Sequence, residues 1–147
     1  MEDLERVEIA PHLQYWEVAD RSFLFNQCLG HMHVSTLVAW EKLREVLGVP
    51  IYVSSGFRTE ATNKKKGGTE GSQHLIGRAL DLHCSNRNLA DLQYVSLFLR
   101  CGFRGIGRGD HWVHLDTRRG NAAFWKYIQK GRISDHAAYN IYKETTI

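Results

Sequence analysis

The sequence contains little proline and no long apolar run. Only 2 of its 147 residues are proline, which excludes collagen-like and proline-rich chains. No stretch approaches the ~20 apolar residues that a membrane helix needs, so we expect no membrane insertion. The first residues, MEDLER, are acidic and lack the basic segment and apolar stretch of a signal peptide. We therefore expect no signal peptide and synthesis in the cytoplasm.

Cysteine is also scarce. The three cysteines, Cys28, Cys84 and Cys101, are odd in number and form no C-x-x-C spacing. This pattern argues against a disulfide framework and against a zinc finger built on thiolates. Cys84 and Cys101 lie in apolar sequence, where we expect buried thiols.

An excess of charge of one sign is missing as well. The net charge is +3, and the one basic cluster is 64–66, which is more typical of a solvated loop than of a phosphate-binding stripe. We expect no nucleic-acid partner, although a mild positive charge suits an anionic polymer. With 43% hydrophobic and 24% charged residues, the composition predicts one globular domain over 1–147, acting as a monomer.

Hydrophobic periodicity gives an outline of the fold. Helical spacing, β-rich runs and turn residues indicate the following elements. Helices are predicted at 34–47, 89–99 and 122–129, strands at 51–54, 79–84, 103–107 and 112–117, and a long polar loop at 55–78. The tail after residue 133 is predicted to be a helical turn or coil. This order predicts an α+β domain with a small, mostly antiparallel sheet and helices packed on one side.

Histidine is unusually frequent, with 8 residues. His74, Asp81 and His114 would supply two imidazoles and one carboxylate, a set typical of catalytic zinc sites that keep a fourth position open for water. Gly77 would let the backbone bring His74 and Asp81 to one point. Strand alternation places Asp116 on the face of His114. From spacing alone, a structural role for these residues remains the more common outcome.

Four motifs in order resemble the zinc D-alanyl-D-alanine carboxypeptidase family. SQHLIGRALD at 72–81 is similar to the family signature S-x-H-x-x-G-x-A-x-D, and SGFR at 55–58 is similar to its S-G-Y-R segment. WVHLDTR at 112–118 resembles the W-V-H-V-D-x-R ending, and GIG at 105–107 resembles the strand before it. The resemblance covers about 34–118.

The resemblance implies a zinc peptidase that acts on the stem peptides of bacterial peptidoglycan. His74, Asp81 and His114 would bind Zn²⁺, Arg58 would bind a substrate carboxylate or polarise the scissile carbonyl, and Ser72 would contact substrate. The fold would be the one shared with lysostaphin-type peptidases and the hedgehog domain. Carboxypeptidase and endopeptidase modes both remain open, as does a phage lytic enzyme that a lysis system releases to the wall.

One departure from the family concerns the general base. Many members have Glu or Asp three residues before the last ligand, where this chain has His111, preceded by Asp110. His111 is favoured as the base because its pKa lies near working pH, with Asp110 as the second candidate. Gly105, Gly107 and Gly109 would allow the bend that His111 needs. The alternative is a non-catalytic zinc domain used for binding or as a structural virion protein.

Overall fold

A computed structural model describes residues 8–20 and 32–145. Its elements, in chain order, are β1 (Glu8–Ala10), β2 (Leu13–Gln14), α1 (Tyr15–Val18), α2 (Val34–Leu47), β3 (Tyr52–Ser55), α3 (Glu60–Lys65), η3 (Gln73–Ile76), β4 (Ala79–His83), η4 (Leu92–Tyr94), α4 (Val95–Cys101), β5 (Gly105–Arg108), β6 (Val113–Asp116), β7 (Ala123–Ile128), β8 (Gly131–Ser134) and α5 (His136–Thr145). The central sheet has six strands in the order β3-β4-β6-β5-β7-β8. Within it, only β5 and β7 pair in parallel. This confirms the predicted α+β class and its mostly antiparallel sheet.

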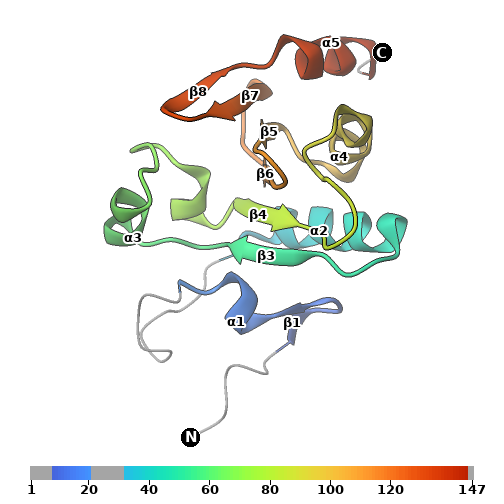
Figure 1. The fold of residues 1–147 in the computed structure, drawn as a ribbon. Coiled ribbons are helices and arrows are strands. Elements are labelled where there is room, and N and C mark those ends of the chain that lie inside the picture. The colour runs from blue at the N-terminus through green and yellow to red at the C-terminus, as the bar shows by residue number, and fades with distance from the viewer. Residues whose placement is uncertain (1–7, 21–31, 146–147) are drawn as a thin grey trace, which may run out of the picture.

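The helices α2, α4 and α5 share one hydrophobic core with one face of the sheet (Figure 1). The helices and strands contribute fully buried side chains that include Trp40, Phe98, Leu80, Leu82 and Leu115. Because side chains alternate along a strand, Asp81 and His114 project from the opposite face. The sheet therefore separates an apolar core from a polar surface that carries the predicted site.

The long helix α2 has the bounds that the periodicity predicts. His33 precedes it with extended backbone, and its ring accepts a hydrogen bond from the N–H of Ser35. At the other end, Gly48 adopts a φ of 64° and its N–H bonds the carbonyl of Arg44. Only glycine takes this left-handed conformation readily, so Gly48 ends the helix.

The helix predicted at 122–129 is wrong. Residues 123–128 form β7, which lies parallel to β5 and antiparallel to β8. The segment AFWKYI is rich in aromatic and β-branched residues, which fit a half-buried pleated surface better than a short helix. The tail is also more regular than expected, because 131–134 form β8 and α5 follows.

The described residues bear on two expectations, the absence of a membrane helix and the burial of the cysteines. None of the helices in 8–20 and 32–145 is long and apolar enough to cross a membrane. Cys101 is a buried free thiol as expected, whereas Cys84 is only partly buried. Cys28 lies outside the described residues.

Candidate metal centre and cavity

His74 is held at the start of the short helix η3. Ser72 precedes the helix, and its hydroxyl accepts a hydrogen bond from the backbone N–H of His74 at 3.3 Å. Gly77 ends the helix with a φ of 70° and so turns the chain directly into β4. This tight turn explains how His74 comes close to Asp81 only seven residues later.

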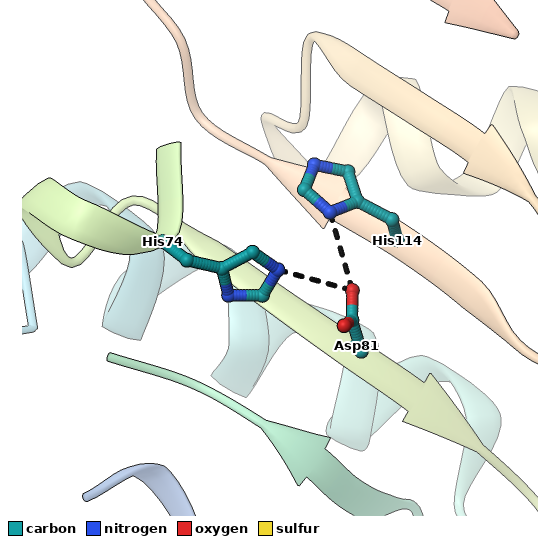
Figure 2. Close-up of side chains that lie close together, drawn as sticks. All are labelled: His74, Asp81 and His114. Atoms are coloured by element: carbon teal, nitrogen blue, oxygen red, sulfur yellow. Dashed lines mark hydrogen bonds and ion pairs between the residues drawn. The ribbon is translucent and has the colours of Figure 1, made fainter. Parts of the chain in front are cut away.

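Asp81 and His114 lie directly opposite each other on the neighbouring strands β4 and β6. The Asp81 Oδ1 atom is 3.2 Å from His74 Nε2 and 3.2 Å from His114 Nδ1 (Figure 2). All three side chains are buried, and their candidate ligand atoms lie within 4.8 Å of one another. The structure thus brings together the three residues that the sequence singles out as metal ligands.

The remaining ring nitrogen of each histidine has its own partner. His74 Nδ1 lies 2.6 Å from the carbonyl oxygen of Gly56, to which it donates a hydrogen bond. His114 Nε2 lies 2.7 Å from Asp116 Oδ2 and donates to that carboxylate. Such outer hydrogen bonds fix the ring orientation of metal-binding histidines. His74 would therefore coordinate a metal through Nε2, and His114 through Nδ1.

Two of the three ligand–ligand distances fit a small tetrahedral cation. With metal–ligand bonds of about 2.0 Å, the edge of a tetrahedron is about 3.3 Å. The two distances of 3.2 Å from Asp81 Oδ1 are close to that edge. In addition, a neutral His74 that donates from Nδ1 directs the lone pair of Nε2 at the Asp81 carboxylate. Two acceptors at this distance repel each other unless a proton or a cation lies between them.

Burial and charge set the protonation of the three groups. Burial lowers the pKa of His74, despite its contact with Asp81. Burial acts in the same direction on His114, but the contacts with Asp116 and Asp81 outweigh it and raise the pKa of His114. For Asp81, burial favours the neutral form, yet the contacts with His114 and His74 hold its pKa well below the usual range. A metal ion would thus meet an ionised carboxylate, and it would compete with protons for the two histidines.

Asp116 is a buried anion behind His114 that the sequence analysis gave no role. Its carboxylate accepts two hydrogen bonds from the Arg118 guanidinium, at 2.8 and 2.7 Å, as well as the one from His114. On the neighbouring strand, a Cβ atom at Gly105 would lie 2.2 Å from this carboxylate. The glycine at 105 therefore leaves the space that Asp116 occupies. The i, i+2 spacing of His114 and Asp116 on one strand face is the sequence signal that could have identified it.

Arg58 lies beside the centre and binds the second oxygen of Asp81. Its NH2 group donates to Asp81 Oδ2 at 2.9 Å, and its Nε donates to Ser55 Oγ at 2.9 Å. A longer contact of 3.4 Å joins its NH1 group to Asn63 Oδ1. These bonds direct Asp81 Oδ1 toward the histidines. They also leave two of the five guanidinium N–H groups available to another molecule.

A cavity of about 480 Å³ opens over the three residues. Chain segments on both sides of the centre line the cavity. Among the described residues, the lining consists of Arg58, Lys66, Gly67, Gly68, Thr69, Gly71, Ser72, Gln73, His74, Asp81, Trp112, His114, Arg118, Trp125, Tyr127, Ile128, Gly131 and Arg132. Ser72, the predicted substrate contact, is among them. Asp81 is the one carboxylate in this set, whereas four members are lysine or arginine. The cavity therefore suits an anionic ligand.

Asp110 and His111, the two candidates for a general base, lie between β5 and β6. Their side chains are 92% and 80% exposed and 3.8 Å apart. Neither belongs to the lining of the cavity. The chain does bend at Asp110 and His111, just before β6, but the bend leaves both side chains in solvent. Cβ atoms at Gly107 and Gly109 would lie 2.4 and 2.2 Å from the indole Nε1 atoms of Trp125 and Trp112, so these glycines make room for tryptophan rings beside the cavity.

Known proteins resemble this chain across the region of the site. The sequence matches the family described as Peptidase M15 over residues 11–116, a segment that contains His74, Asp81 and His114 and ends before β7. It is also similar to a zinc D-Ala-D-Ala carboxypeptidase of Streptomyces albus G, with 30% identity over 94 residues. That match covers 61% of this chain and 36% of the Streptomyces protein. The similarity therefore extends over about a third of the relative's length.

Proposed function

The chain belongs to the peptidase M15 family, and on this basis we propose that it is a zinc-dependent peptidase that hydrolyses an amide bond next to a D-amino acid in peptidoglycan stem peptides. The name of the Streptomyces relative supports the zinc ion and the D-alanyl substrate. The proposed enzyme acts as a monomer, because the ligands and the cavity lining all come from one chain. Release to the cell wall by a phage lysis system is part of the same proposal.

The convergence of His74, Asp81 and His114 is the observation that carries the proposal. One carboxylate oxygen and two imidazole nitrogens meet at the floor of the cavity, and the outer nitrogens are already bonded elsewhere. This nitrogen and oxygen donor set suits zinc and leaves a fourth position toward the cavity. When bound there, a zinc ion would polarise a scissile carbonyl and lower the pKa of water.

The other residues of the cavity have complementary roles in this proposal. Arg58 holds Asp81 in a monodentate orientation, and its free N–H groups bind the substrate carbonyl or carboxylate. Ser72 orients His74 and lies in the cavity wall, where it contacts the peptide. Asp116 keeps the His114 ring in position. These contacts preorganise the site before substrate arrives.

We propose that His111 acts as the general base and takes the proton of the attacking water, with Asp110 as the second candidate. Both side chains are exposed beside Trp112, which does line the cavity, so a rotation of this loop would be needed to bring either group in. The same exposure favours the second candidate function, in which the domain binds zinc and peptide without hydrolysing it.

The experiment that separates the two functions uses the zinc-loaded protein and purified peptidoglycan. Mass spectrometry of the products should show either loss of a terminal D-alanine, which indicates a carboxypeptidase, or opened cross-links, which indicate an endopeptidase. Asp81→Ala serves as the matched control and should release nothing. A protein that contains one zinc per chain and yields no product would establish the binding function instead.

A further inference from the structure

The β7–β8 hairpin forms one wall of the cavity, although it lies outside the segment that matches the family. In Figure 1 the hairpin stands above the segment that runs from α3 to η3, and residues from both line the cavity. Trp125, Tyr127 and Arg132 come from this hairpin. The matched segment therefore does not account for this part of the site.

The three side chains form a connected layer beside the metal ligands. The Trp125 ring centroid lies 5.1 Å from that of His114, and the Arg132 guanidinium carbon lies 4.7 Å from the Trp125 ring. Tyr127 pairs with Arg132 across the two strands. The Trp125 indole ring thus lies between Arg132 and His114. At about 3.5 Å per residue, these two contacts together span at most about three residues of an extended peptide.

Arg132 differs from the other arginines of the cavity in its charge balance. Arg58 is paired with Asp81, and Arg118 is paired with Asp116. Arg132 makes no ion pair with a carboxylate of the described residues, and its guanidinium lies over the face of Trp125. Stacking on an aromatic ring orients a guanidinium while its N–H groups remain free to bind a planar anion.

We propose that Arg132 is a specificity-determining residue that binds a carboxylate of the substrate peptide, within about three residues of the metal centre. This inference rests on the proposed peptidase function. Two carboxylates could meet Arg132: the side-chain carboxylate of the residue before the D-alanines, or the C-terminal carboxylate. The chemistry of recognition is the same, and the test below tells them apart.

The test compares three synthetic peptides that differ only in their carboxylates. They are acetyl-Glu-D-Ala-D-Ala, acetyl-Gln-D-Ala-D-Ala and the C-terminal amide of the glutamine peptide. The zinc-loaded wild type, Arg132→Ala and Arg132→Lys are assayed for kcat/KM on each. Lys126→Ala is the matched control, because Lys126 is an exposed cation of the same hairpin that does not line the cavity.

In Arg132→Ala we expect kcat/KM to fall about 10–100-fold on the peptides that carry the recognised carboxylate, mainly through KM, since a hydrogen bond to a charged group is lost. Arg132→Lys should keep part of the preference, because it retains charge without the planar fork. A loss confined to the glutamate peptide identifies the side-chain carboxylate. A loss on both free acids but not on the amide identifies the C-terminus. An equal effect on all three peptides, or none, overturns the inference.

A binding measurement keeps the inference separate from the proposed function. If the wild type hydrolyses none of the peptides, titration calorimetry of the same peptides against the same four proteins decides. Tighter binding of an anionic peptide that disappears in Arg132→Ala, but not in Lys126→Ala, supports the carboxylate site while the peptidase proposal fails. Equal binding of the three peptides by the wild type overturns the carboxylate site.

Discussion

The substitution Asp116→Asn tests whether the buried anion behind His114 controls metal binding. Asparagine has nearly the same shape, and its amide oxygen still accepts one hydrogen bond from His114 Nε2. It carries no charge, however, and its NH2 group would face the Arg118 guanidinium, which now donates to both carboxylate oxygens. The ring of His114 would therefore lose its electrostatic partner, and the repulsion between the new NH2 group and Arg118 would disturb the bond that orients the ring.

The expected effect has two parts. Removing an outer hydrogen-bond partner of a metal ligand lowers metal affinity about 10–100-fold, which corresponds to about 1.4–2.7 kcal/mol. Breaking a buried ion pair costs about 3 kcal/mol of folding free energy. For a chain of this length that lowers Tm by about 6–12 °C. Metal affinity is measured by competition with a chromophoric chelator, and Tm is measured on the metal-free protein so that metal binding does not contribute.

The control is Asp135→Asn, which alters a second buried carboxylate whose ion-pair partner is Arg108 and not a candidate metal ligand. Asp135 accepts hydrogen bonds from Arg108 at 2.7 and 3.1 Å and is as well buried as Asp116. We expect a similar fall in Tm and no change in metal affinity. Wild-type metal affinity in a folded Asp116→Asn protein would refute the orienting role. An equal loss of affinity in both variants would show that general loosening, and not the bond to His114, is responsible.

Four further substitutions test the site. His74→Ala should abolish stoichiometric zinc in elemental analysis, because two ligands remain; full zinc content would remove His74 from the ligand set. Arg58→Lys at saturating zinc should retain the metal but lose most of its kcat/KM, since lysine lacks the fork; wild-type turnover would contradict this. Gly105→Ala should weaken zinc binding in the same chelator assay, because its Cβ would lie 2.2 Å from Asp116, and unchanged affinity would show that the strands separate without cost. His111→Ala should keep zinc and lose about 10²–10⁴-fold in kcat, whereas loss only in Asp110→Ala would move the base to residue 110.

Local signals explain why the three candidate ligands can be placed near one another from the sequence. Gly77 ends η3 in the left-handed conformation, which brings His74 toward Asp81 within one turn of chain. Alternation along β6 then places His114 and Asp116 on one face. The pairing of β4 with β6, which sets Asp81 opposite His114, is a long-range contact that no local pattern encodes. The expectation that Asp81 and His114 lie close together came instead from the order of the motifs that resemble the family.

The hairpin at 123–134 was not predicted because its structure depends on distant partners. Phe124 and Ile128 at helical spacing favour a helix when the segment is considered alone. In the fold, β5 offers an unpaired edge, and parallel pairing with that edge satisfies the backbone of β7. Since the aromatic side chains gain burial on either side of the strand, tertiary context outweighs local spacing.

The glycines of β5 make room both for Asp116 behind His114 and for Trp125 of the hairpin. A strand with side chains at 105 and 107 would collide with the Asp116 carboxylate and with the Trp125 indole. Because residues 105 and 107 lack side chains, the Asp116 carboxylate on β6 and the Trp125 indole on β7 can both lie beside His114. The anion holds the ring of the candidate ligand His114, and the Trp125 ring lies against Arg132 beside the cavity. One short glycine-rich strand thus allows both the candidate metal centre and the hairpin wall of the cavity.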